Sequence, residues 1–168
     1  MNSTFSLDES HCYVYYYIRE GLWRSLIHFC KDADSRYGDP FFIFWRAFAI
    51  YKEGNPSQAV NELQQIEKKR ELQWATTKAL IFYHNKCAAP DRRTVDQLNI
   101  MEGDFERKAT DRATVAVAYF FMFNNDPDMA RDVLSNCKFE SPAVFCCKGW
   151  LEVMELKNQE SKVNFNLT

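Results

Sequence analysis

One pattern occurs twice in this sequence, and the two copies lie 71 residues apart. The first copy places Ala47 in an apolar stretch, followed by Asn55-Pro56 and then by Ala59 and Leu63. The second copy repeats these features as Ala118, Asp126-Pro127, Ala130 and Leu134 (118 − 47 = 71). Four features of different chemistry that share one spacing indicate an internal repeat. The chain is therefore expected to fold as an array of similar units.

Each copy has the pattern of two helices joined by a short turn. In the first copy, Gly54 interrupts the helical spacing, and Asn55-Pro56 then supplies an N-cap residue followed by proline at the first helical position. A second apolar stripe begins at Ala59 and continues to Ile66. The stripe before the turn consists of Phe41, Phe44, Trp45, Phe48 and Tyr51. A unit of this kind is about 34 residues long, the length of a tetratricopeptide repeat.

The residue sizes at the repeated positions suit close packing of helices. Small residues such as Ala47 and Ala59 let the two helices of one unit approach each other, and Leu63 fills the space towards the next unit. Pro142 ends one unit and begins the next, because proline cannot continue the preceding helix. The predicted structural positions are Gly21, Ala47, Gly54, Ala59, Leu63, Ala79, Ala118, Ala130, Leu134, Pro142, Gly149 and Trp150.

We therefore predict an all-α, right-handed solenoid of helix–turn–helix tetratricopeptide repeats, in a single array over residues 1–168. The expected repeats are 7–39, 40–71, 72–110, 111–141 and 142–156, followed by a polar tail at 157–168. The third repeat is irregular because Gly103 weakens its second helix, and the fifth supplies a first helix only. That last helix carries apolar residues without a neighbouring repeat, including Phe145 and Val153. We expect a partner or a further repeat to cover them, and the chain to be a truncated form or a piece of a longer array.

Composition excludes several other classes of protein. Gly and Pro number five each, which disfavours β-sandwiches, barrels and glycine-rich phosphate loops. A net charge of −2 is unlike that of a nucleic-acid-binding protein. The longest uncharged run, 113–125, is too short to cross a membrane, and no signal peptide is recognisable. We predict a cytoplasmic chain that binds no nucleic acid and does not insert into membranes.

No set of residues has the spacing of a catalytic or metal site. The six cysteines form no Cys-x-x-Cys pair, and no histidine lies at zinc-ligand spacing from two of them. His84 lies three residues before Cys87, but nothing in the sequence orients the histidine as a base. Cys146 and Cys147 are adjacent and point in different directions on a helix. We predict that the chain is not an enzyme and holds no cofactor or metal.

Repeat arrays of this type bind other proteins on the concave surface that their first helices line. Tyr and Arg are frequent anchors of such interfaces because they combine a large contact area with a polar end. Phe44 and Phe48 have an alternative interpretation, as core packing between repeats. We expect the ligand to be a helix or an extended segment. The candidate partner-binding residues are His11, Tyr15, Arg19, Phe44, Phe48, Lys52, Tyr83, Tyr119 and Met122.

Several short motifs add a resemblance to one family. In chain order they are Arg36-Tyr37-Gly38-Asp39-Pro40, Glu53-Gly54, Ala79-Leu80-Ile81-Phe82-Tyr83-His84-Asn85-Lys86, Pro90-Asp91-Arg92, Ala130-Arg131-Asp132 and Lys148-Gly149-Trp150-Leu151-Glu152. Together they resemble the N-terminal region of the tetratricopeptide repeat protein 21 family, also called the intraflagellar transport 139 subunit. The resemblance extends from Tyr16 to Val153. The sequence departs from the family pattern at Asn125, where the family has a turn glycine, and at Asp126-Pro127-Asp128, which replaces a basic turn.

The resemblance implies a non-catalytic scaffold that works with other proteins. Members of the family are subunits of intraflagellar transport complex A, which acts in retrograde ciliary transport and cilium assembly. By resemblance, the partners are further subunits of that complex, and the location is the cilium and the ciliary base. The alternative is a generic tetratricopeptide adaptor that binds a helical or extended peptide in its groove outside cilia.

Overall fold

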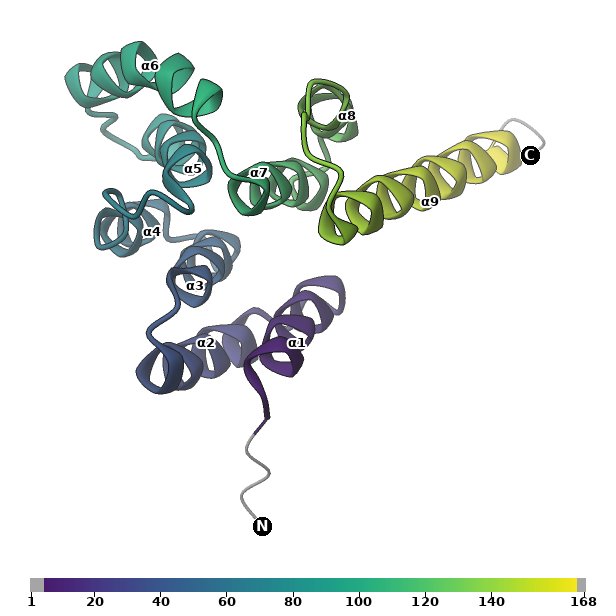
Figure 1. The fold of residues 1–168 in the computed structure, drawn as a ribbon, viewed down its shortest axis with the longest axis horizontal. Helices are drawn as coiled ribbons and strands as arrows, with labels where there is room; N and C mark the ends of the chain where they lie inside the picture. The colour runs from purple at the N-terminus through teal and green to yellow at the C-terminus, as the bar shows by residue number, and fades with distance from the viewer. Residues whose placement is uncertain (1–4, 166–168) are drawn as a thin grey trace. The chain divides into compact units, whose positions relative to one another are not determined.

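A computed structural model of the chain describes the backbone of residues 5–165 and the side chains of residues 5–156. This part of the chain forms nine helices and no strand (Figure 1). The helices are α1 (Leu7–Arg19), α2 (Trp23–Tyr37), α3 (Pro40–Lys52), α4 (Pro56–Gln64), α5 (Gln73–Lys86), α6 (Arg92–Arg107), α7 (Asp111–Phe123), α8 (Pro127–Ser135) and α9 (Pro142–Phe165). The first eight form four consecutive hairpins, and α9 follows them. The prediction of an all-α solenoid class is confirmed.

The helices belong to two compact units, Met1–Arg107 and Lys108–Thr168. The first unit contains α1 to α6, and the second contains α7, α8 and α9. The sequence alone predicts one continuous array. The boundary falls at the end of the third repeat, whose second helix the sequence marks as irregular. Consistent with that irregularity, α6 buries only Val95 and Leu98 and leaves Ile100 81% exposed.

The turns of the second and fourth hairpins have nearly identical backbone geometry. Asn55 has φ −118° and ψ 72°, and Asp126 has φ −120° and ψ 70°. Each side chain accepts a hydrogen bond from the backbone N–H three residues later, which caps the following helix. The preceding residue is left-handed in both turns, with φ 88° at Gly54 and φ 60° at Asn125. Asparagine adopts this conformation more readily than most residues, so Asn125 can replace the family's turn glycine.

The small residues of the repeat lie where the hairpins are closed. Ala47 and Ala59 in the first unit and Ala118 and Ala130 in the second are fully buried. The large residues that follow on the second helices, Leu63 and Leu134, are also buried. Close approach of each helix pair therefore depends on side chains no larger than a methyl group. Of the other repeat positions, Ala79 is buried, Gly21 is left-handed at the α1–α2 turn, and Pro142 is the first residue of α9.

Enlarging one of these alanines should force the hairpin apart. We predict that Ala59→Leu lowers the free energy of unfolding by about 1–3 kcal/mol, because added methylenes in a filled core push neighbouring side chains off their rotamers. Ala130→Leu should have a similar effect in the second unit. Asn61→Leu is the matched control, because Asn61 is exposed on the same helix. Urea unfolding that shows the same stability for Ala59→Leu and Asn61→Leu would contradict the assigned packing.

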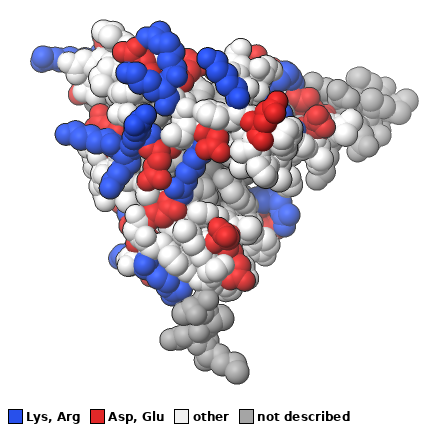
Figure 2. Space-filling model, in the orientation of Figure 1, with Lys and Arg blue, Asp and Glu red and all other residues white. Residues whose placement is uncertain are grey.

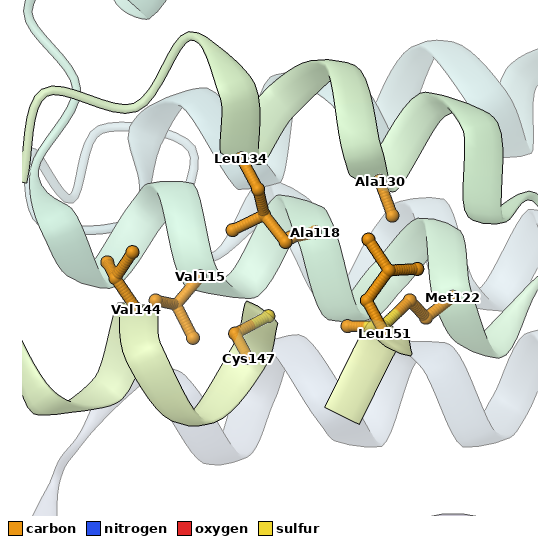
Figure 3. Close-up of a cluster of buried hydrophobic side chains, with 8 residues drawn as sticks. All are labelled: Val115, Ala118, Met122, Ala130, Leu134, Val144, Cys147 and Leu151. Atoms are coloured by element: carbon orange, nitrogen blue, oxygen red, sulfur yellow. The ribbon is translucent and has the colours of Figure 1, made fainter. Parts of the chain in front are cut away.

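The core of the second unit is formed by all three of its helices (Figure 3). The side chains of α7, α8 and α9 point towards one another in this cluster. The buried members are Val115, Ala118, Met122, Ala130, Leu134, Val144, Cys147 and Leu151. Trp150, one of the predicted structural positions, is half-buried against the cluster. The α7–α8 hairpin therefore has its apolar face covered by α9.

The last helix is longer than the sequence indicates. A helix ending near Leu156 and a polar tail beyond it are the expectation, but α9 continues to Phe165. Gln, Glu and Lys in this stretch are good helix formers, and loss of apolar residues does not by itself end a helix. Residues 166–168 of the predicted tail lie outside the described part of the chain.

Candidate protein-binding surface

Three of the candidate residues lie along one side of α1. His11, Tyr15 and Arg19 are four residues apart, which places them on the same helix face. The His11 Nε2 atom lies 3.1 Å from Oδ2 of Asp39, the residue that caps α3. The Tyr15 ring meets the Trp45 ring edge-on at 5.7 Å between centroids. This side of α1 therefore rests on α3 through its first two members.

Arg19 is the most accessible of the three. Its side chain is 55% exposed and bonds the adjacent Glu20 carboxylate, with Nε 2.9 Å from Oε1. Its guanidinium carbon also lies 5.7 Å from the centroid of the Tyr16 ring, and Tyr16 is itself 47% exposed. A pair at this level of exposure contributes little to stability, so Arg19 is available for a partner.

The two phenylalanines of α3 belong to the core of the first unit. Phe44 is 1% exposed and Phe48 is fully buried. Phe48 packs edge-on against Trp45 at 5.4 Å, and against Trp23 of α2 at 6.0 Å. Burial of both residues supports the interpretation as packing between helices, and it leaves them out of reach of a partner.

Lys52 places a charge at the end of this aromatic core. Its Nζ atom lies 5.0 Å from the centroid of the Phe48 ring and 5.7 Å from that of Tyr51. The ammonium group is thus stabilised by aromatic faces while it is half-buried. The same burial lowers the pKa of Lys52 below its ordinary value, because desolvation disfavours the charged form.

Tyr83 of α5 extends the aromatic contacts but does not reach the surface. It is 1% exposed, and its ring stacks on Tyr51 at 4.9 Å between centroids. Burial is the main cause that raises the pKa of its hydroxyl well above the ordinary value, so the phenol stays neutral. The half-buried residues beside it are Tyr51 and Phe82, which sequence reasoning did not select as binding residues. In the sequence, the only sign that Tyr51 could contact a partner is its position at the edge of the apolar stripe of α3.

The two remaining candidates, Tyr119 and Met122, belong to the second unit. Met122 is fully buried in the cluster of Figure 3. Tyr119 is half-buried, its ring stacks on Phe123 at 5.6 Å, and burial raises the pKa of its hydroxyl above the ordinary value. Both residues therefore pack in the core cluster of the second unit. The accessible candidates in the first unit are His11, Tyr15, Arg19 and Lys52.

The placement of His84 and Cys87 shows whether these two side chains could act together in catalysis. No hydrogen bond joins the His84 and Cys87 side chains in the described residues, and Nε2 of His84 is buried without a hydrogen-bond partner there. The Cys87 sulfur instead accepts a bond from Ser57 Oγ at 3.6 Å. No group of three or more His, Cys, Asp or Glu in the described part of the chain is placed to hold a metal. A nucleophile with an oriented base is therefore not assembled among these residues.

Surface charge and the apolar character of the helices bear on binding to nucleic acids and to membranes. On the visible face, basic and acidic side chains are interspersed rather than gathered by sign (Figure 2). The described residues on this face therefore form no basic stripe of the kind that follows a phosphate backbone. Within the described residues, no helix combines the length and the apolar character needed to span a bilayer.

The cysteines should differ sharply in reactivity. Burial raises the pKa of Cys147 to about 12 and raises that of Cys30 still further above its ordinary value. At pH 8 both remain protonated thiols, which are poor nucleophiles, and both are inaccessible. We predict that iodoacetamide modifies the exposed Cys12 and Cys146 in the native chain, and modifies the buried pair only after unfolding. Peptide mass spectrometry checks this order, and early labelling of Cys147 would contradict the packing of α9.

The hairpins, the capped turns and the buried alanines define the chain as a helical-hairpin repeat protein. Its family follows from comparison with known sequences. A family profile described as "Tetratricopeptide repeat protein 21 N-terminal ARM repeat" matches residues 14–167, and the chain belongs to this family. The resemblance seen in the sequence motifs is thereby confirmed.

Individual relatives agree with the family match. Tetratricopeptide repeat protein 21B of Mus musculus is 24% identical over 153 residues, which covers 89% of this chain and 12% of the relative. The Homo sapiens protein of the same name has the same values. Tetratricopeptide repeat protein 21A of Mus musculus is 24% identical over 148 residues, 86% of this chain and 11% of the relative. The chain therefore spans only about an eighth of the length of these relatives.

Proposed function

We propose that this chain is a non-catalytic protein–protein scaffold that acts with intraflagellar transport complex A in retrograde ciliary transport and cilium assembly. The observation that carries the proposal is the family match over residues 14–167. The resemblance to the tetratricopeptide repeat protein 21 family implies the ciliary role, the ciliary base as location and other complex subunits as partners. A repeat fold that exposes polar and aromatic side chains along its helices suits such a role.

We further propose that partners contact the α1–α3 surface, defined as His11, Tyr15, Arg19 and Lys52. Arg19 and Lys52 are basic, His11 contacts the Asp39 carboxylate, and the ring of Tyr15 packs against Trp45. Buried aromatic rings contact His11, Tyr15 and Lys52 and restrict their motion, so these three side chains lose little conformational entropy on binding. A helix or extended segment with acidic residues is the ligand that this surface favours.

The alternative function is a generic adaptor that binds peptides through the same surface outside cilia. The two proteins 21B are each 24% identical to this chain, and at this identity a relative can share the fold and differ in its partners. The two functions differ in which proteins accompany the chain, and not in the fold.

Affinity purification of the tagged chain from ciliated cells separates the two functions. We expect subunits of complex A to be recovered with the wild-type chain. Arg19→Glu combined with Lys52→Glu should reduce that recovery several-fold, because both reverse a charge on the α1–α3 surface. Lys31→Glu is the control, since Lys31 is exposed on α2 and outside the surface. Recovery of chaperones without transport subunits would favour the adaptor, and a thermal melt of each variant verifies folding.

A further inference from the structure

One position recurs on the first helices of four repeats and has a defined partner in two of them. It is the residue directly before the small packing residue. The four pairs are Arg46-Ala47 on α3, Lys78-Ala79 on α5, Val117-Ala118 on α7 and Lys148-Gly149 on α9. Three of the four residues at this position are basic.

In the second and third repeats, this basic residue forms an ion pair with a glutamate of the second helix of the same hairpin. Arg46 Nη2 lies 2.7 Å from Glu62 Oε2 on α4, and Lys78 Nζ lies 2.8 Å from Glu102 Oε1 on α6. All four side chains are at most 24% exposed, so each pair is shielded by the hairpin that it joins. Partial shielding makes such pairs selective for the helix that docks there.

The fourth repeat has apolar residues at both matching positions. Val117 is fully buried, and the position 71 residues after Glu62 is Val133, a half-buried residue that packs on the cluster of the second unit (62 + 71 = 133). The first-helix residue and its second-helix counterpart thus change chemistry together. A basic residue at this position therefore indicates a second helix that carries a glutamate, and an apolar residue indicates one that carries an apolar side chain.

On α9 the same position is charged, but no second helix follows among the described residues. Lys148 is half-buried and forms no ion pair with any residue of the described part of the chain. Gly149 is exposed with open space around it, whereas Ala47, Ala79 and Ala118 are fully buried under their hairpin partners. The surface that a second helix covers elsewhere is thus not covered by any described residue here.

A groove lies at this surface, between α8 and α9, with a volume of about 340 Å³. Leu134 and Leu151 supply its apolar part, and Ser135, Lys148 and Glu152 supply polar side chains. Arg131 of α8 and Glu155 of α9, which also line the groove, pair with each other. Other apolar side chains on α9 are also uncovered, with Phe145 58% exposed and Val153 44% exposed. The groove thus brings two leucines together with Lys148, which forms no ion pair with any residue of the described part of the chain.

We propose that the α8–α9 groove binds an amphipathic helix of a partner protein that presents a glutamate to Lys148 and a small residue to Gly149. The pattern follows from α4, where Ala59, Glu62 and Leu63 occupy positions i, i+3 and i+4 of the docked helix. A glutamate at position i+3 of the docked helix would pair with Lys148, as Glu62 pairs with Arg46. This inference concerns a different surface from the α1–α3 surface and does not depend on the ciliary role.

A peptide that imitates α4 tests the proposal directly. The probe is a fluorescent, covalently helix-constrained peptide carrying residues 55–66, titrated with the full chain and followed by fluorescence anisotropy. We expect saturable binding that Lys148→Glu weakens by about tenfold or more, and a probe carrying Glu62→Lys that recovers affinity for the Lys148→Glu chain. Gly149→Leu should weaken binding comparably, because it fills the approach without meeting a neighbour in the free chain. Lys138→Glu is the control, an exposed lysine outside the groove lining.

Crosslinking and oligomer measurements decide between occupants. A photoreactive group on the probe should label α8 and α9. Absence of saturable binding, equal binding by the Lys148→Glu chain, or crosslinks confined to the first unit would overturn the proposal. A dimer in sedimentation equilibrium that Lys148→Glu dissociates would assign the groove to a second copy of the chain, and would likewise overturn the partner helix.

Discussion

Replacing Trp45 by alanine is expected to lower the free energy of unfolding by about 3–5 kcal/mol. Trp45 is fully buried at the centre of α3, and its ring contacts those of Tyr15, Phe44 and Phe48. Removing it leaves a large cavity, and it also deprives α1 of an aromatic contact on α3. The loss should therefore exceed that of any single surface substitution in this chain.

Chemical denaturation of the Trp45→Ala chain checks this expectation. The matched control is Phe145→Ala, because Phe145 is also aromatic but is 58% exposed, and its replacement should change stability by no more than about 0.5 kcal/mol. Equal stability losses in the two variants would show that α3 does not form the core of the first unit.

Leu134→Ala is expected to cost about 2–5 kcal/mol of unfolding free energy in the second unit. Leu134 is 3% exposed and lies among side chains of α7 and α9 in the cluster of Figure 3. Its removal leaves a cavity at the point where three helices meet, and the described part of this unit has few other contacts to compensate.

Hydrogen exchange of the amides in α7, α8 and α9 measures the effect of Leu134→Ala locally, because exchange reports the free energy of opening each segment. Leu156→Ala serves as the comparison, since Leu156 lies in α9 but is 60% exposed. If protection in these helices is the same for both variants, the assigned packing of α8 is incorrect.

The repeat architecture was accessible from the sequence because its signals are local. A capping residue followed by proline fixes the start of a helix, and Asn55-Pro56 and Asp126-Pro127 both do so with the same backbone angles. Ala59 and Ala130 reveal where helices touch, because only small side chains allow close approach. These features depend on residue type at a fixed spacing, which one sequence displays in full.

The binding surface was less accessible because α3 is apolar on nearly all sides. Nine of its thirteen residues are buried, so helical spacing cannot separate a surface stripe from the core. Phe44 and Phe48 therefore fit either interpretation until their neighbours are known. Tyr83 is similar, because its burial depends on stacking against Tyr51 from another helix. Such contacts join residues that are distant in the sequence.

Two further features depend on interactions that residue spacing does not report. The division of the chain after Arg107 follows a helix, α6, that buries little of its surface. The continuation of α9 to Phe165 involves polar residues, which are compatible with either a helix or a loop. Thr110 caps α7 soon after Arg107, but a cap marks where a helix begins and does not report where two units divide.

Sedimentation of the tagged 19.8-kDa chain in a density gradient of ciliated-cell lysate tests the central claim most directly. If the chain is a scaffold of the transport machinery, it should sediment with the subunits of complex A, far below the position of a free protein of its mass. Arg19→Glu with Lys52→Glu should shift it towards the free position, and Lys31→Glu should not. A wild-type chain that stays at the free position, or that sediments only with chaperones, would contradict the account.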